Sequence, residues 1–279
     1  MKTGRASKTA LGVAIRRAAH QLMDDPPILV DPIAVPLIGR GHQRLMERAM
    51  HPVGRDFRAF MAVRSRYTED RLADAVGQGV SQYVVLGAGL DTFAYRNPFA
   101  GLRVFEVDFP ATQEGKRAML AEAEIPIPEN LTFVPLDFEY HTLAEGLVEA
   151  GFEARKPAYF GWLGVVPYLT LEAFRSTVTD IARLPAGTAV SFDYALSPET
   201  LSLLGRMAFD RLAERVAAAG EPFQLFFTKE TLELELRRAG FRRVEQLDYE
   251  QINERYFKDR ADGLKLSAVK LAMLVAAWV

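Results

Sequence analysis

The sequence predicts an α/β fold in which a mostly parallel sheet is covered by helices on both faces. From residue 81 onward, short apolar runs alternate with helical segments, which is the pattern typical of such a sheet. The clearest run, residues 83–86, stops at Gly87-Ala88-Gly89, where two glycines allow a steep backbone turn. The next apolar run ends at Asp108, which lies 19 residues after Gly89.

Seven strands are expected, each short and rich in β-branched or aromatic residues. They cover residues 82–86, 103–108, 131–136, 158–162, 188–194, 241–247 and 266–276. Helices are expected between them, and Pro110, Thr170 and Thr228 are suitable residues for three helix starts. A helix over about 199–218 is longer than a tight crossover requires, so we expect a helical insertion there that contributes to a lid.

The first 80 residues predict helices and no strand. Apolar positions recur at helical spacing over residues 6–23, and the run Asp24-Asp25-Pro26-Pro27 ends that helix. Two short helices are expected within 33–50 and a longer one over 56–76. We therefore divide the chain into an N-terminal helical extension or cap, residues 1–80, and an α/β core, residues 81–279.

Composition excludes several classes of protein. The chain has 279 residues, of which 49% are hydrophobic and 25% charged, as in ordinary globular domains. A formal net charge of −2 argues against a general nucleic-acid binder, and no apolar run is long enough to cross a membrane. The lack of cysteine excludes disulfides and thiolate chemistry, and it favours a cytoplasmic location. Residues 1–80 hold 13 Lys and Arg against 8 Asp and Glu, either as solvated helix faces or as a basic cap over an anionic small molecule.

Three strand ends are expected to form one ligand site. The first strand ends in the glycine turn Gly87-Ala88-Gly89, the second in Asp108 and the third in Asp137. In an open α/β sheet the ligand lies in the crevice at the carboxyl ends of the strands. The interval between Gly89 and Asp108 is close to that at which a βαβ unit places an acid on a ribose hydroxyl. The sequence therefore predicts a nucleoside-containing ligand.

The turn discriminates between candidate ligands. A dinucleotide site prefers Gly-x-Gly-x-x-Gly, but the sixth position here is Thr92 and the fifth is Asp91. We expect Asp91 to put a negative charge near the start of the following helix, where a phosphate would bind. S-adenosyl-L-methionine has no phosphate and carries a sulfonium cation, so it is the favoured cofactor.

Long runs around this turn resemble a known family. They are Leu86-Gly87-Ala88-Gly89-Leu90-Asp91-Thr92-Phe93-Ala94-Tyr95-Arg96 and Phe105-Glu106-Val107-Asp108-Phe109-Pro110, followed by Lys116. Further matched runs include Lys8-Thr9-Ala10-Leu11, Arg64-Ser65-Arg66, Trp162-Leu163-Gly164-Val165 and Asn253-Glu254-Arg255-Tyr256-Phe257. The chain resembles the leucine carboxyl methyltransferase family, in particular its bacterial branch of proposed S-adenosylmethionine-dependent methyltransferases. The fold implied is a Rossmann-like seven-stranded methyltransferase sheet, mostly parallel with an antiparallel last strand.

The resemblance implies a role for each candidate residue. Asp108 accepts hydrogen bonds from the ribose hydroxyls, Asp137 accepts one from the adenine amino group, and Phe138 lies beside the base. Gly87, with Ala88 and Gly89, lets the methionine part cross the turn. Arg64 matches the arginine that holds the methionine carboxylate, with Arg66 as second candidate and Lys8 as a weaker one. Both arginines could instead lie on an exposed helix face.

One position departs from the family pattern. In the carboxyl methyltransferases proper an acid precedes the Gly-Val at the end of the fourth strand, and here that residue is Leu163. The departure leaves open how the cofactor amino group is held. It also argues against methylation of a protein C-terminus.

The acceptor is expected to be a small molecule, methylated on a carboxylate or a hydroxyl by direct in-line transfer. A carboxylate is already ionised and needs no base, whereas a hydroxyl could use His141, Asp193 or Tyr194. His141 and Asp193 also suit purely structural positions at element ends, so no catalytic residue is assigned. Six aromatic residues are candidates for an acceptor pocket or for the core: Trp162, Tyr168, Phe226, Phe227, Tyr256 and Phe257.

Two alternatives stay open at this point. An NAD-linked oxidoreductase would use the same sheet, although the third glycine of its turn is missing. A non-catalytic S-adenosylmethionine-binding protein is suggested by Leu163. The histidines show no metal-ligand spacing, no metal site is predicted, and the oligomeric state is not predictable.

Overall fold

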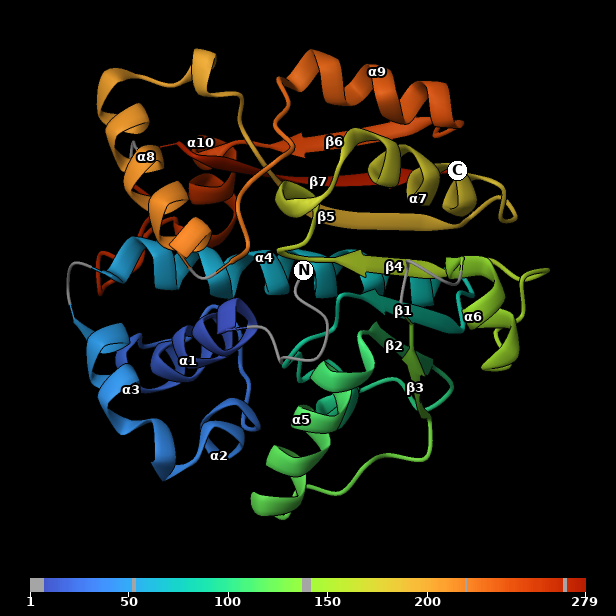
Figure 1. Ribbon diagram of the computed structural model, residues 1–279, viewed down its shortest axis with the longest axis horizontal. Helices are drawn as coiled ribbons and strands as arrows, with labels where there is room; N and C mark the ends of the chain where they lie inside the picture. The colour runs from blue at the N-terminus through green and yellow to red at the C-terminus, as the bar shows by residue number, and fades with distance from the viewer. Residues whose placement is uncertain (1–7, 52–53, 137–141, 219, 268–269) are drawn as a thin grey trace.

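The computed structural model describes residues 8–51, 54–136, 142–218, 220–267 and 270–279, and it contains one seven-stranded sheet. The strand order is β3-β2-β1-β4-β5-β7-β6 (Figure 1). The strands are β1 (Gln82–Leu86), β2 (Arg103–Asp108), β3 (Leu131–Pro135), β4 (Tyr159–Trp162), β5 (Ala189–Ala195), β6 (Arg243–Leu247) and β7 (Ala272–Trp278). The strands β1 to β5 pair in parallel, and β7 runs antiparallel between β5 and β6. The predicted fold class is therefore confirmed.

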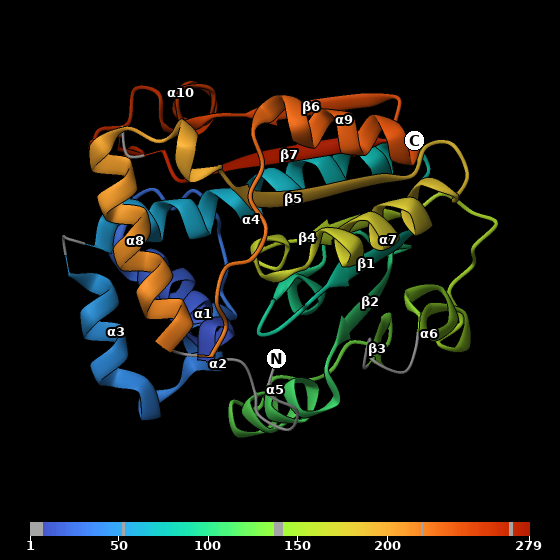
Figure 2. The ribbon, with the colours of Figure 1, turned by 45° about the horizontal axis from the view of Figure 1, so that its top comes forward.

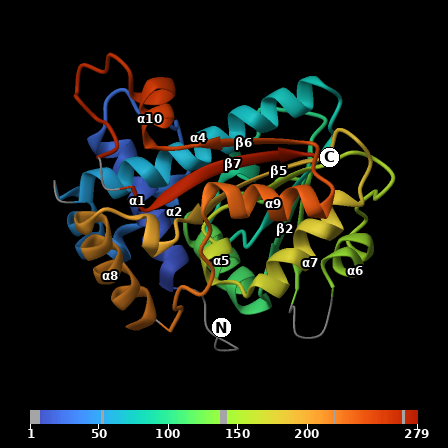
Figure 3. The ribbon, with the colours of Figure 1, turned by 90° about the horizontal axis from the view of Figure 1, so that it is seen from above.

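Helices cover both faces of the sheet (Figure 3). Phe105 and Val107 of β2 point into the cluster formed with α6 (Leu143–Glu149), α7 (Leu171–Ala182) and α9 (Lys229–Ala239). Val104 points to the opposite face, where it packs with Leu72 of α4 (Arg55–Gly77). The alternation of side chains along a strand thus gives each face its own core.

The helices that precede α4 form a separate cluster at one end of the sheet. They are α1 (Lys8–Met23), α2 (Ala34–Ile38) and α3 (Gln43–Met50), joined by the short helix η1 (Arg40–His42). Their apolar side chains pack with Leu90, which follows the glycine turn, and with Leu120 of α5 (Pro110–Glu122). The N-terminal helices are therefore attached to the end of the sheet where the ligand site is expected.

The helix α8 (Leu203–Ala218) lies within the segment predicted to be a helical insertion. It lies at the same end of the molecule as α1 (Figure 2). Burial lowers the pKa of Arg16 in α1, and the like charge of Arg215 in α8 lowers it further. The contribution of α8 to a lid stays a prediction.

Two segments differ from the sequence prediction. The last strand begins at Ala272 instead of residue 266, because the backbone of Leu266 bonds the side chain of Asn253 and not a neighbouring strand. Leu264 and Leu266 pack in the cluster with α4 and do not belong to the sheet. The segment after the glycine turn forms only a four-residue 3-10 helix, η3 (Phe93–Arg96), where a longer helix is usual.

Four short elements complete the described chain. They are η4 (Val166–Tyr168), η5 (Pro198–Thr200), α10 (Tyr249–Ile252) and the π-helix η6 (Asn253–Phe257). Across the described residues, no helix has both the length and the apolar character that crossing a membrane requires.

Candidate cofactor site

Asp108 joins the ends of β1, β2 and β3 through hydrogen bonds. Its Oδ2 accepts a hydrogen bond from the backbone N–H of Gly89 at 2.6 Å, and its Oδ1 accepts one from Phe109 at 2.7 Å. Its backbone carbonyl accepts the N–H of Leu136, just after β3, at 2.9 Å. Burial raises the pKa of Asp108, although these backbone donors oppose the shift.

The Asp108 carboxylate can still bind a ligand. An ionised carboxylate offers about four lone-pair sites, and the two backbone N–H groups use two of them. The residue keeps 9% of its surface exposed. Binding of the ribose hydroxyls by Asp108 stays a prediction.

The glycine turn is in close contact with the end of β4. Gly87 has φ +64° and Gly89 has φ +49°, in the left-handed region that favours glycine. A Cβ at Gly87 would overlap Cγ2 of Val165, and one at Gly89 would lie 3.0 Å from Cβ of Ala10 in α1. Both positions therefore favour glycine, and the turn contacts Val165, in the segment after β4, on one side and α1 on the other.

Arg64 of α4 forms a buried ion pair with Asp193 of β5. Its Nη1 lies 3.0 Å from Oδ2 of Asp193, and both side chains are 7% exposed. The other carboxylate oxygen accepts the N–H of Gly164 at 2.6 Å. Gly164 has φ +71°, and a Cβ there would lie 3.0 Å from two nitrogens of Arg64. The pair thus adjoins Val165 and, through it, the glycine turn.

The guanidinium of Arg64 has unused donors. Its Nε is buried and has no hydrogen-bond partner among the described residues. A guanidinium carries five N–H donors in a planar fork that suits a carboxylate. Arg64 therefore fits the predicted role of binding the methionine carboxylate.

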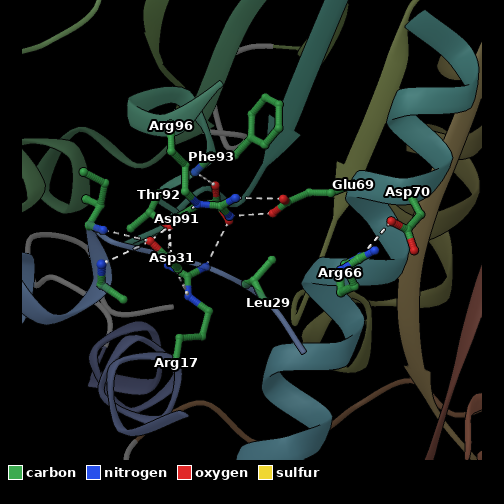
Figure 4. Close-up of polar contacts among 12 residues, drawn as sticks. Arg17, Leu29, Asp31, Arg66, Glu69, Asp70, Asp91, Thr92, Phe93 and Arg96 are labelled. Atoms are coloured by element: carbon green, nitrogen blue, oxygen red, sulfur yellow. Dashed lines mark hydrogen bonds and ion pairs between the residues drawn. The ribbon is translucent and has the colours of Figure 1, made fainter. Parts of the chain in front are cut away.

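A network of charged residues joins α1 to the glycine turn (Figure 4). Arg17 donates to the carbonyl oxygen of Leu90 at 2.8 Å and to the carboxylate of Asp91 at 3.1 Å. Asp91 also accepts the N–H of Phe93 at 2.8 Å, at the start of η3. Burial raises the pKa of Asp91, but Arg17 and other cations hold it below the ordinary value. An ionised carboxylate therefore occupies the helix start where a dinucleotide phosphate would bind, as the sequence predicts.

The same network extends to α4. Asp31 accepts a hydrogen bond from the hydroxyl of Thr92 at 2.5 Å, and its carboxylate lies 3.4 Å from Nε of Arg96. Arg96 in turn makes two hydrogen bonds to Glu69 of α4, at 2.7 and 2.5 Å. The turn is thus fixed from both the N-terminal helices and α4.

A second buried ion pair lies behind Asp108. Nζ of Lys116 in α5 is 2.5 Å from Oε2 of Glu106 in β2, and both side chains are 1% exposed. Burial raises the pKa of Glu106 to about 7, although Lys116 opposes the shift. Lys116 also lowers the pKa of the nearby Asp108, so it favours the ionised form of that carboxylate.

Comparison with known proteins identifies the family. A model described as leucine carboxyl methyltransferase matches residues 10–182. The chain is 33% identical over 293 residues to YktD of Bacillus subtilis (strain 168), a proposed S-adenosyl-L-methionine-dependent methyltransferase, with 95% of each chain covered. A similarly described protein of Mycobacterium avium (strain 104) is 34% identical over 203 residues, covering 69% of this chain and 66% of that protein. The chain belongs to the leucine carboxyl methyltransferase family.

Solved structures agree at the level of the fold. A proposed methyltransferase from Thermobifida fusca YX has a TM-score of 0.59 and 16% sequence identity, covering 99% of this chain and 96% of that chain. The match to the leucine carboxyl methyltransferase family, together with the relative in Bacillus subtilis, confirms the predicted enzyme class and its cofactor, S-adenosyl-L-methionine.

Not every predicted site residue of this family member can be placed. Asp137, Phe138 and His141 lie outside the described residues, so their roles stay predictions. Lys8 begins α1, but its side chain is not described. The side chain of Arg66 is 47% exposed and pairs with Asp70 at 2.7 Å, apart from the network around Asp91 (Figure 4). The structure therefore favours Arg64 over Arg66.

The expected alternative bases have other partners. Asp193 is not a capped strand end but a buried partner of Arg64 within β5. The hydroxyl of Tyr194 donates to Gln246 at 2.6 Å. Burial raises the pKa of this hydroxyl above its ordinary value. Both side chains therefore have structural partners within the described residues, Arg64 and Gly164 for Asp193 and Gln246 for Tyr194.

Half of the six aromatic candidates belong to the core. Trp162, which stacks on Phe174, and Phe227 lie in the cluster under α7 and α9, and Phe257 lies in that against α4. Tyr256 is half-buried and donates to Asp70 at 3.0 Å. Tyr168 and Phe226 are also half-buried, and they stay candidates for an acceptor pocket.

Sequence reasoning missed Arg17 and the pairing of Asp193. Arg17 lies on a helix with ordinary periodicity, and its partner Asp91 is 74 residues away. Asp193 is 129 residues from Arg64. The one local signal is that a charged residue interrupts the apolar run of β5, which is costly unless the charge is paired.

Proposed function

We propose that this methyltransferase transfers a methyl group to an oxygen atom of a small molecule, and that this oxygen belongs to a carboxylate. The observation that carries the proposal is that Asp193 and Tyr194, the expected bases in the described part of the site, are bound to Arg64 and Gln246. A hydroxyl acceptor would require a base, whereas a carboxylate is ionised at neutral pH.

The residues of the chain have a positioning role in this reaction. The cofactor supplies a methyl group on a sulfonium, and in the transfer the acceptor oxygen forms a bond to the methyl carbon as the sulfur–carbon bond breaks. Asp108 binds the ribose, and Arg64 binds the methionine carboxylate. Holding donor and acceptor in line is worth up to about 7–11 kcal/mol of the barrier.

A base-lability assay tests the proposal. Purified protein is incubated with a protein-free metabolite extract and methyl-labelled cofactor, and the products are then treated with alkali. Methyl esters release labelled methanol under alkali, whereas methyl ethers keep the label. We expect volatile label with the wild-type protein and much less with Asp108→Ala at the same cofactor concentration.

Two outcomes contradict the proposal. Base-stable label would indicate a hydroxyl or nitrogen acceptor, and label that appears only when the protein fraction of the extract is restored would indicate a macromolecular acceptor. The cytoplasmic location stays a prediction.

A further inference from the structure

The Arg64–Asp193 pair has the composition of a receptor for a zwitterion. One cation and one anion lie side by side, Nη1 to Oδ2 at 3.0 Å, and both side chains are 7% exposed. The pair is neutral as a whole, which is what permits it to be buried. A purely anionic ligand at Arg64 would also face the negative charge of Asp193.

Both Arg64 and Asp193 can make further hydrogen bonds besides those of their ion pair. Nε of Arg64 is buried without a hydrogen-bond partner among the described residues. The Asp193 carboxylate accepts one bond from Arg64 and one from the N–H of Gly164, which leaves about two of its four lone-pair sites. A second cation–anion pair can therefore bind without breaking the first one.

The position of the pair matches one end of a ligand that crosses the glycine turn. Gly164 touches Asp193, its neighbour Val165 packs on Gly87, and Gly89 on the other side of the turn binds Asp108. The residue before Gly164 is the apolar Leu163, and the carboxylate that accepts the N–H of Gly164 belongs to Asp193 of β5. The contacts form a continuous path from Asp193 to the ribose-binding acid.

We propose that Asp193 binds the α-ammonium group of the cofactor's methionine moiety while Arg64 binds its α-carboxylate. This inference rests on the proposed binding of the cofactor at the strand ends. It adds a binding residue, and it gives the α-amino acid zwitterion, not the carboxylate alone, as the group that is recognised.

Three ligands test the proposal by calorimetry. S-adenosylhomocysteine carries the full zwitterion, its des-amino analogue lacks the ammonium group, and 5′-methylthioadenosine lacks the whole amino-acid end. We expect Asp193→Asn to weaken S-adenosylhomocysteine binding at least tenfold. The same variant is expected to leave the other two dissociation constants within threefold, or to tighten the des-amino analogue because Arg64 then has a free charge.

Asp24→Asn provides a matched control. The side chain of Asp24, which directly follows α1, is buried and only 2% exposed. It pairs at 2.8 Å with Arg58, which lies on α4 as Arg64 does. We expect this variant to leave all three affinities within threefold.

The outcomes separate this proposal from the proposed function. If Asp193→Asn weakens all three ligands equally, or weakens none, then Asp193 is not the ammonium site. If the variant does not fold, the wild-type comparison decides, because equal affinity for S-adenosylhomocysteine and its des-amino analogue overturns the proposal. Failure of the wild-type protein to bind any of the three would instead overturn the cofactor site itself.

Discussion

At the scale of residues, Glu106 and Asp108 lie two positions apart on β2 and serve different purposes. Asp108 keeps a partly exposed carboxylate that two backbone N–H groups orient. Glu106 is enclosed, and its Oε1 has no hydrogen-bond partner among the described residues. Lys116 pairs with Glu106, and its charge also lowers the pKa of Asp108.

Glu106 makes the folded state more stable at mildly acidic pH. Its pKa is about 7 in the folded protein against an ordinary 4.5, so between these values the folded protein holds a proton that the unfolded chain has released. The free energy of unfolding therefore falls as the pH rises through this window, by at most about 1.4 kcal/mol per pH unit for one proton. Urea unfolding of Glu106→Gln at several pH values should show a flatter profile.

The exposed Glu114, on α5 beside Lys116, gives the control. Glu114→Gln should keep the wild-type slope. If Glu106→Gln kept it as well, Glu106 would not be the titrating group.

At the scale of elements, the glycine turn depends on its contact with the end of β4. A side chain at Gly87 meets two obstacles, the positive φ of +64° and the methyl group of Val165. Gly87→Ala should destabilise the protein by about 2 kcal/mol or more, since left-handed backbone alone costs roughly 1–2 kcal/mol. Denaturant unfolding measures the change.

The double variant Gly87→Ala/Val165→Ala separates the two causes. It should recover the part of the loss that is due to the overlap and keep the part that is due to backbone strain. Gly101→Ala, at an open position with no atom within 4 Å, should change stability little. A loss at Gly101 equal to that at Gly87 would contradict the account of the turn.

The attachment of α1 to the turn depends on Arg17. Arg17→Met leaves the half-buried carboxylate of Asp91 without its nearest cation, and this should cost up to about 3–5 kcal/mol, the loss typical of a broken buried pair. Thermal or urea unfolding should show this loss, and a further Asp91→Asn change should recover part of it. Arg66→Met, which breaks an exposed pair, should cost at most about 1 kcal/mol. Equal losses in the two single variants would contradict a specific role for Arg17.

The same elements show what the sequence could and could not predict. The strand β1 and its turn are encoded locally, by an apolar run followed by two glycines with positive φ, and both were predictable. The partners Arg17–Asp91 and Arg64–Asp193 are far apart in the chain, and no local pattern marks them. The apolar residues near Leu266 misled the prediction of the last strand because burial against α4 and burial in a sheet select the same residue types.

At the scale of the whole molecule, contacts from several elements converge on the carboxyl ends of β1, β2, β4 and β5. The helices α1 and α4 hold the glycine turn through Arg17, Arg96 and Glu69 (Figure 4). The role of residues 1–80 as a cap over the bound ligand stays a prediction, as do the roles of Asp137 and Phe138. The central claim is that these strand ends form the cofactor site.

Calorimetric titration with S-adenosylhomocysteine of the wild-type protein and of Asp108→Ala tests this claim most directly. The wild-type protein should bind, and Asp108→Ala should bind at least tenfold more weakly, because hydrogen bonds to a carboxylate contribute about 1.5–3 kcal/mol each. A thermal melt of each protein without ligand shows whether the variant is folded. An unchanged dissociation constant in a folded Asp108→Ala variant would contradict the assignment of the site.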